Sequence, residues 1–137
     1  MALVDDLREL LDGSSFYRWN GIEVVRADAG EVTLGLELVD HHRNVQGFAH
    51  GGVLATLADA AMGLSVRTAM EPGRRHVTVE MGVHYLRPVT GGWVTAAGRA
   101  IRVGREIAYA EAVVTDGSDR DLARASGTYS VTTRRDQ

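Results

Sequence analysis

The sequence predicts an α+β fold in which an antiparallel β-sheet wraps around one long central helix. Residues 51–70 predict the helix, because apolar side chains recur there at helical spacing and small residues fill most other positions. That pattern is typical of a helix that is buried nearly all round. Two strand-like segments precede this helix and four follow it. The buried helix therefore supplies the surface that the strands cover.

The first half of the chain begins with a short predicted helix over residues 1–15, where leucines recur at helical spacing and Gly13 is a natural stop. Residues 21–40 predict two strands separated by the turn ADAG, since apolar residues alternate along the second strand. Residues 41–50 form a polar loop before the central helix. The Pro-Gly pair at 72–73 ends that helix.

The second half of the chain predicts four strands separated by the turns VTGG, VGR and DGSDRD. The strand-like segments are 76–88, 92–103, 106–116 and 122–133. The chain contains no internal repeat and no linker, so residues 1–137 are expected to form a single domain.

Composition excludes several classes of function. The formal net charge of −3 argues against general nucleic-acid binding, which needs a basic surface. The absence of cysteine removes disulfides, thiolate metal sites and a cysteine nucleophile, and the absence of lysine removes Schiff-base chemistry. No targeting segment is visible, and no apolar run approaches the roughly 20 residues that span a membrane. We therefore expect a soluble, cytoplasmic protein without a membrane or nucleic-acid partner.

The segment HHRNVQGFAHGGVLATLADAAMG, residues 41–63, carries the candidate chemistry. Gly51 opens the predicted helix, where exposed backbone N–H groups and the positive end of the helix dipole favour an anion or a developing oxyanion. Asp59 lies eight residues further on, as a single acid among alanines and leucines. A carboxylate in an apolar setting costs several kcal/mol unless it has partners or a use. The segment thus offers an oxyanion donor and a base or nucleophile.

Residues 41–63, with VTVEMGVHYLRP at 77–88, resemble the hotdog-fold acyl-CoA thioesterases of the phenylacetate-degradation (PaaI) type, a branch similar to the thioesterase superfamily members of mammals. The resemblance covers roughly residues 20–132 and is carried by Asn, then Gly, then His-Gly-Gly, then Leu-Ala-Asp. Some hotdog thioesterases have Glu at the helix position. Asp59 therefore favours the phenylacetate-type branch over the branch that serves quinone biosynthesis.

The resemblance implies catalytic roles for five residues. Asp59 would be the catalytic carboxylate, as general base on water or as nucleophile, and the amide of Gly51 would polarise the thioester carbonyl. Asn44 would lie near the thioester and the attacking water, with His50 beside the oxyanion site. Thr78 falls where relatives carry a Ser or Thr that orients water.

The resemblance also implies binding residues for the substrate. Tyr85 and the segment from Arg102 through Gly104 to Arg105 fall where relatives contact the CoA moiety, and arginine at a strand turn suits phosphate.

Two further residues next to the oxyanion site are candidates for substrate binding. Gly52 leaves the site open to substrate because it has no side chain. Phe48, next to the HGG sequence, is expected either to pack or to touch the acyl group.

Two points of strand geometry qualify these roles. Thr78 and Tyr85 lie an odd number of residues apart, so a regular strand would place them on opposite faces. Both could line one site if the strand bulges at Gly82, or if the site reaches both faces. His76 and His84 lie eight residues apart and are expected on one face, in a solvated or structural role.

A metal site is not expected. His41, His42 and His50 with Asp59 suggest one, but adjacent histidine side chains diverge, and zinc needs three or four converging ligands. No cofactor is expected either, since coenzyme A is part of the substrate.

The sequence therefore predicts an acyl-CoA thioesterase that releases a carboxylic acid and free CoA from an aryl, phenylacetyl or medium-chain acyl thioester. One alternative is a hotdog enoyl-CoA hydratase or dehydratase, which would pair His50 with Asp59 for proton transfer at carbon. A second is an acyl-CoA-binding regulator without turnover, although the chain has no room for an appended output element.

The spacing of the candidate residues predicts a shared site. At 1.5 Å per residue, Gly51 and Asp59 lie roughly 12 Å apart along the helix axis. A donor and a base must both lie within about 3 Å of the reacting group or its water, which one straight helix cannot achieve. Two antiparallel copies of the helix can, and the resemblance implies the same: a homodimer, or a dimer of dimers, with sites at the subunit interface.

Overall fold

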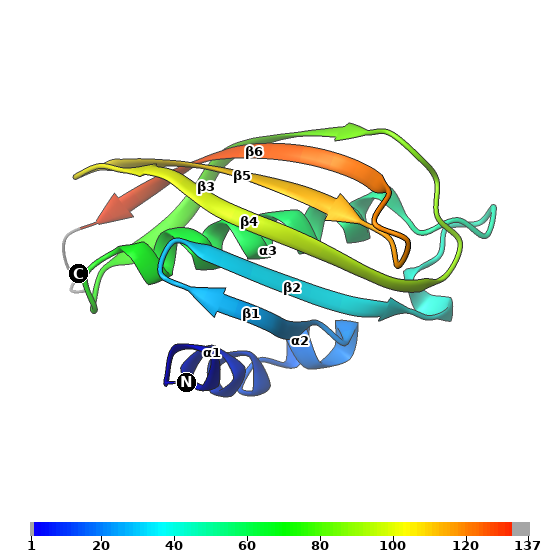
Figure 1. Cartoon of the computed structure of the whole chain (residues 1–137), viewed down its shortest axis with the longest axis horizontal. Coiled ribbons are helices and arrows are strands. Elements are labelled where there is room, and N and C mark those ends of the chain that lie inside the picture. Colours follow the sequence, from blue (N-terminus) through cyan, green and yellow to red (C-terminus); the bar gives the residue numbers. More distant parts are fainter. Residues whose placement is uncertain (1, 133–137) are drawn as a thin grey trace.

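The computed structural model describes residues 2–132 and shows a six-stranded antiparallel sheet that curves around one long helix (Figure 1). The helical elements are α1 (Ala2–Asp12), α2 (Ser15–Asn20), a 3-10 turn η1 (Asp40–His42) and the central α3 (Gly51–Ala69). The strands are β1 (Glu23–Asp28), β2 (Glu31–Leu38), β3 (Arg75–Tyr85), β4 (Gly92–Val103), β5 (Ile107–Thr115) and β6 (Asp121–Thr132). The predicted α+β architecture is confirmed, with two strands before the long helix and four after it.

The N-terminal segment differs from its prediction. The helix expected over residues 1–15 ends at Asp12, and the chain then forms a second helix, α2, which the sequence pattern did not indicate. The Gly13 N–H donates to the carbonyls of Glu9 and Leu10 and so closes α1. Since α2 is only six residues long, it is too short for helical periodicity to reveal it.

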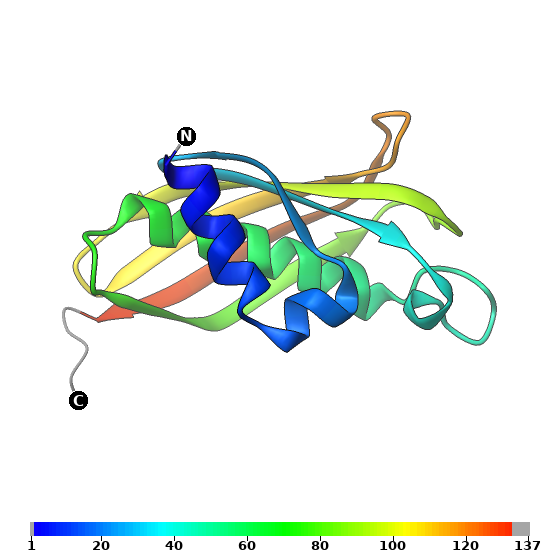
Figure 2. The same ribbon diagram turned by 90° about the horizontal axis from the view of Figure 1, so that it is seen from below.

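The sheet has the strand order β1-β2-β4-β5-β6-β3, so β1 and β3 are its edges. Helix α1 packs against β1, and Figure 2 shows α1 and α2 crossing beneath α3 on its side away from the sheet. The outer edge of β3 has no strand beside it among the described residues, and it carries Val77 at 63% and Val79 at 59% exposure. Exposed apolar side chains on a free edge mark a surface for strand pairing.

Helix α3 is held close to the sheet by small groups. A Cβ atom added to Gly98 of β4 would lie 2.5 Å from the carbonyl oxygen of Ala61, so the missing side chain allows this approach. Ser65 is fully buried, donates to the Ala61 carbonyl at 2.7 Å and accepts from the Val32 N–H at 3.1 Å. The central helix is therefore fixed in depth and in position along the sheet.

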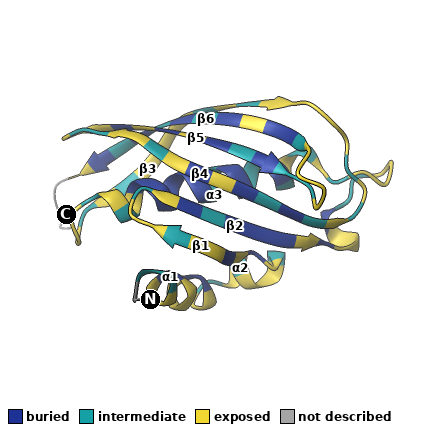
Figure 3. Ribbon diagram, viewed as in Figure 1, coloured by how far each residue is buried: buried dark blue, intermediate teal, exposed yellow. Residues whose placement is uncertain are grey.

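The core lies between α3 and the concave face of the sheet, as the dark segments of Figure 3 show. Apolar residues fill it from α3 and from every second position of the strands. Burying each large side chain of this kind contributes about 1.5–3 kcal/mol. Its largest fully buried apolar members are Tyr129, Leu34, Leu36, Leu57, Met62 and Leu122.

The close approach at Gly98 gives a stability prediction. Replacing Gly98 by Ala should lower the free energy of unfolding by about 1–3 kcal/mol, because the new methyl group overlaps backbone atoms of Ala61. Gly82 on β3 is the matched control, since a Cβ there meets no atom within 4 Å. Urea unfolding measures both variants. Equal, small effects of Gly98→Ala and Gly82→Ala would contradict the packing described.

Candidate active site

Asp59 lies in the middle of α3, half-buried, with its carboxylate turned toward the β3–β6 edge of the sheet. Its Oδ1 accepts two hydrogen bonds of 2.9 Å, one from the Thr78 hydroxyl and one from the Tyr129 hydroxyl. Thr78 on β3 and Tyr129 on β6 are directly opposite each other in the strand register. Oδ2 has no hydrogen bond to any described residue. One carboxylate oxygen is thus anchored and the other is available for chemistry.

A bulge in β3 places Thr78 and Tyr85 on the same side of the strand. The register shifts between Thr78 and Glu80, whereas Gly82 pairs regularly with Ser126, so the bulge lies at Val79 and not at Gly82. Thr78 therefore reaches Asp59 while Tyr85 reaches the start of α3.

The bulge also separates the two histidines of this strand. His76 is half-buried and lies within van der Waals reach of Gly63 on α3, whereas His84 is exposed. The expectation that the two share a face is wrong, because the bulge reverses the alternation between them.

Tyr129 was not among the residues predicted for the site. A signal exists in the sequence: it is a tyrosine among the small residues of a strand, and a buried tyrosine hydroxyl needs a hydrogen-bond partner. The lone acid of the central helix needs donors for the same reason. The sequence does not show that Tyr129 is the donor for Asp59. That requires knowing that β6 and β3 lie side by side next to the middle of α3, and only the tertiary structure shows this.

A pocket of about 230 Å³ opens beside Asp59. Its lining combines the Asp59–Thr78–Tyr129 group with the outer face of α3, His76 of β3 and two residues from the N-terminal helices, Leu10 and Tyr17. The helix α2 that the sequence did not indicate therefore forms one wall of the site.

Burial and charge in the pocket shift the pKa values of His76 and Tyr17. Burial lowers the pKa of His76, the positive charge of Arg67 lowers it further, and Asp59 opposes both. Burial raises the pKa of Tyr17, and the negative charge of Asp59 raises it further. A neutral imidazole and a protonated phenol thus lie beside the carboxylate at neutral pH.

The start of α3 is capped by His50, whose Nδ1 accepts from the Gly52 N–H at 2.9 Å. No described residue accepts from the Gly51 N–H, so this donor is open at the positive end of the helix. The Tyr85 hydroxyl donates to the Gly51 carbonyl at 2.7 Å, and its ring lies against the Gly51 Cα. Tyr85, predicted to contact CoA, is thus also a support for the helix start.

Asn44 organises the loop that precedes α3. Its Oδ1 accepts from the N–H groups of Gln46 and Phe48, at 2.9 and 3.1 Å, which leaves its amide NH₂ as the free donor. Phe48 is 37% exposed and Val45, at the tip, is fully exposed. The loop therefore projects from the end of the molecule where α3 begins (Figure 1).

His42 anchors this loop through hydrogen bonds to the backbone on either side of it. It is only 2% exposed; its Nδ1 accepts from the Val39 N–H at 3.0 Å and its Nε2 pairs with the Asn20 carbonyl at 3.0 Å. Its own carbonyl accepts from the His50 N–H at 2.8 Å. Burial lowers the pKa of His42, and the neighbouring charges of His41 and Arg43 lower it further, against the Asn20 hydrogen bond.

Arg102, Gly104 and Arg105 line a separate hollow of about 480 Å³ at the β4–β5 turn. This turn lies at the end of the molecule where α3 finishes, away from Gly51 of the same chain (Figure 1). The hollow shares no lining residue with the Asp59 pocket. Neither arginine forms an ion pair within residues 2–132.

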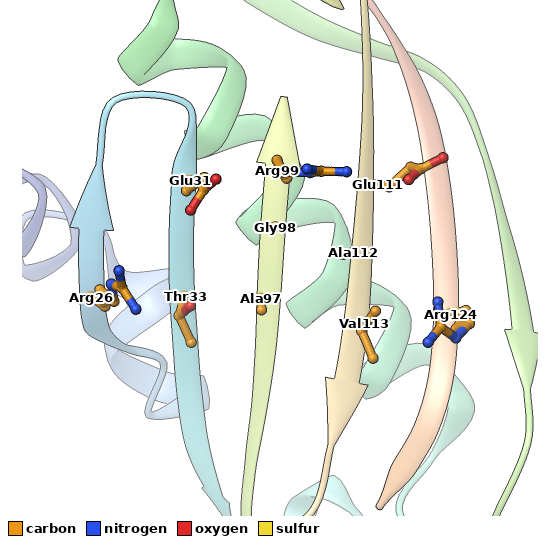
Figure 4. A pocket seen from close by; sticks show the side chains of 10 residues that line it. All are labelled: Arg26, Glu31, Thr33, Ala97, Gly98, Arg99, Glu111, Ala112, Val113 and Arg124. Carbon is orange, nitrogen blue, oxygen red and sulfur yellow. The ribbon is translucent and has the colours of Figure 1, made fainter. Parts of the chain in front are cut away.

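A third hollow, of about 370 Å³, lies on the outer face of the sheet, with α3 behind the strands (Figure 4). Its charges alternate across neighbouring strands, because Arg99 of β4 pairs in register with Glu31 on one side and Glu111 on the other. Arg26 and Arg124 flank this row. None of the predicted site residues lines this hollow, and Asp59 with Thr78 lies on the helix side of the sheet.

The three histidines of the loop region do not form a ligand set. His41 stacks on Trp19 with ring centroids 3.8 Å apart, His42 is tied to the backbone and His50 caps α3. Across the described part of the chain, no group of three or more His, Cys, Asp or Glu side chains is placed to hold a metal ion. In the same residues, no helix is long and apolar enough to cross a membrane.

Comparison with known proteins gives concordant results. The sequence profile of the Thioesterase superfamily matches residues 46–123, more than half of the chain. The 1,4-dihydroxy-2-naphthoyl-CoA hydrolase of Listeria monocytogenes is 29% identical over 115 residues, which is 84% of this chain and 94% of the relative.

Solved structures agree with this fold. A thioesterase from Haemophilus influenzae superposes with a TM-score of 0.90 over 98% of this chain and 93% of its own, at 24% identity. A variant of the phenylacetic acid degradation protein PaaI from Thermus thermophilus superposes with a TM-score of 0.78 over 85% of this chain and 98% of its own, at 27% identity.

The sheet wrapped around a central helix is the hotdog fold, and the family match with its hydrolase relative makes the chain a hotdog-fold thioester hydrolase. The chain belongs to the Thioesterase superfamily. The resemblance to this family, stated above from residues 41–63 and 77–88, is confirmed.

The buried histidine below the loop gives a pH prediction. Since folding lowers the pKa of His42 from its usual 6.5, the unfolded chain binds more protons below that pH, and stability falls as the pH falls. Urea unfolding midpoints at about pH 7.5 and about pH 5.5 should differ less in His42→Gln than in the wild type. His84→Gln is the exposed control. His76 acts in the same direction, so His42→Gln should reduce the dependence without abolishing it. An unchanged dependence in His42→Gln would refute this role.

Proposed function

We propose that the protein is an acyl-CoA thioesterase, with Asp59 as general base or nucleophile and the Gly51 amide as carbonyl-polarising donor. The observation that carries the proposal is the anchored Asp59 carboxylate: two hydroxyls hold Oδ1, Oδ2 has no hydrogen bond among the described residues, and Asp59 lines a pocket. The relative named 1,4-dihydroxy-2-naphthoyl-CoA hydrolase supports a thioester of CoA as the substrate class.

The reaction follows from these groups. Oδ2 of Asp59 takes a proton from water as the water oxygen attacks the thioester carbonyl carbon. The Gly51 N–H and the helix dipole stabilise the negative charge that develops on the carbonyl oxygen. The C–S bond then breaks, and the CoA sulfur receives the proton from Asp59. If Asp59 attacks directly, water hydrolyses the resulting anhydride, and the products are the same.

The site is completed by a second copy of the chain. Gly51 and Asp59 lie roughly 12 Å apart along α3, too far to act on one carbonyl. The free β3 edge with its exposed valines is suited to pairing with the same strand of a partner, which brings the two α3 helices antiparallel. The projecting Asn44 loop of one subunit then reaches Asp59 of the other.

The same arrangement gives the arginine hollow a role. In an antiparallel pair, the β4–β5 turn of one subunit lies at the end where α3 of the other begins. Arg102 and Arg105 of one chain would then flank a site built from their own Asp59 and the partner's Gly51. Their unpaired guanidinium groups are suited to the phosphates of CoA.

The pocket limits the acyl group. Leu10 and Tyr17 line one side of this open pocket, and its volume of about 230 Å³ within one chain compares with the cavity of about 150 Å³ that holds benzene. This favours an aryl or phenylacetyl group, or a short to medium aliphatic chain, over a long fatty acyl chain.

The hydratase alternative is less well supported. It needs a histidine paired with the acid, but His50 caps the start of α3, and the Asp59 carboxylate accepts only from Thr78 and Tyr129 among the described residues. The histidine that lines the pocket is His76, and it makes no hydrogen bond to Asp59.

Thiol release is the direct test of this function. The purified protein should release thiol from benzoyl-, phenylacetyl- or hexanoyl-CoA, and a chelator should not stop it. Asp59→Asn should lower kcat by roughly 10²–10⁴-fold, the range for loss of a positioned base. A thiol-reactive chromogenic reagent suits the assay because the protein has no cysteine. No release across the panel would reject the thioesterase proposal, and near-normal turnover by Asp59→Asn would reject the role of Asp59.

Subunit mixing tests the shared site. Asp59→Asn and Gly51→Val should each be inactive, the latter because a Cβ there lies 3.2 Å from the Tyr85 ring. Refolded together in equal amounts, they should recover about a quarter of wild-type activity, since half of the dimers are mixed and each has one intact site. If each site were contained within one chain, the mixture would recover no activity. Subunit exchange between the two variants is demonstrated in the same experiment.

A further inference from the structure

The Tyr129 side chain is fully buried, yet its hydroxyl is directed at the catalytic carboxylate. We propose that Tyr129 is the positioning residue of the site: its O–H holds Oδ1 of Asp59 so that Oδ2 faces the pocket. This inference rests on the thioesterase function proposed above. It assigns a role to a residue that is outside the predicted set and does not itself contact the substrate.

The packing around Tyr129 fixes its ring. A Cβ on Gly127, two residues earlier on β6, would lie 3.1 Å from Cε1 and 3.3 Å from the hydroxyl oxygen of Tyr129. A Cβ on Gly63 of α3 would lie 3.7 Å from Cε2. The two glycines therefore form the slot that the ring fills, between strand and helix. A ring packed in this way cannot adopt another rotamer, so the position of its hydroxyl is fixed.

The hydroxyl can act only as a donor toward the carboxylate. Burial raises the pKa of Tyr129, and the charge of Asp59 and its hydrogen bond raise it further, so the phenol keeps its proton. The bond to Oδ1 measures 2.9 Å, and the Tyr129 hydroxyl oxygen also lies 3.2 Å from the Asp59 backbone carbonyl oxygen. Both contacts hold Asp59 from the sheet side.

Thr78 differs from Tyr129 although both donate to Oδ1. Thr78 is exposed on the edge strand, so its hydroxyl can rotate toward a water in the pocket. Such a rotation would release Asp59 if Thr78 were its only anchor. With Tyr129 in place the carboxylate stays oriented, which leaves Thr78 free to orient the attacking water.

The kinetic test compares Tyr129→Phe with Thr95→Val. Phe keeps the ring in its slot and removes only the O–H. Thr95→Val likewise removes one hydroxyl hydrogen bond, to Thr115 between β4 and β5, outside the site. Tyr129→Phe should lower kcat by roughly ten- to a hundredfold, the effect of a misplaced catalytic group, with KM within about twofold. Thr95→Val should leave both constants unchanged. A kcat for Tyr129→Phe within about twofold of wild type would overturn the proposal.

An unfolding cycle tests the contact without relying on activity. Urea midpoints are measured for Tyr129→Phe, Asp59→Ala and the double variant. The shift caused by Tyr129→Phe should be clearly smaller when Asp59 is already Ala, because the carboxylate acceptor is gone. Equal shifts in both backgrounds would show that the hydroxyl does not hold Asp59, and would overturn the proposal. If the wild type releases no thiol, the thioesterase function fails, and the cycle still decides whether Tyr129 anchors the carboxylate.

Discussion

The structure depends on how a single carboxylate is accommodated on a buried helix. No residue of α3 hydrogen-bonds to the Asp59 side chain, and an unsatisfied charge there would cost several kcal/mol. Two adjacent strands supply one hydroxyl each, from directly opposite positions, to the same carboxylate oxygen. The candidate site is therefore also a place where helix and sheet are joined by polar contacts, so the proposed catalytic group and the fold depend on the same atoms.

This arrangement requires close contact between the helix and the sheet. Gly98 has no side chain at the point where α3 crosses β4. The Ser65 hydroxyl forms hydrogen bonds with the backbone of β2 and with the backbone of α3 itself. Gly63 and Gly127 make the slot for the Tyr129 ring. The small residues of this protein thus set the depth of α3, and that depth brings the carboxylate within hydrogen-bond distance of both hydroxyls.

The two ends of α3 have different roles. The N-terminal end carries an open N–H donor and a projecting loop, supported by His42 below and Tyr85 beside it. The middle carries the anchored acid and a pocket that the N-terminal helices close. One chain supplies both parts but separates them by its own helix geometry. The proposed antiparallel pair of subunits would join them, and it would also cover the free edge of β3.

The sequence alone determined the class of fold, the limits of α3 to within a residue, and Asp59 and Gly51 as the candidate catalytic groups. These follow from local rules: helical spacing, strand alternation, glycine at a helix start and a lone charge among apolar residues. The sequence alone could not determine the position of the β3 bulge, the wall formed by α2 or the partnership of Tyr129 with Asp59. Those depend on which strands lie beside the helix. Residues 59 and 129 are seventy positions apart, and only tertiary packing brings them together.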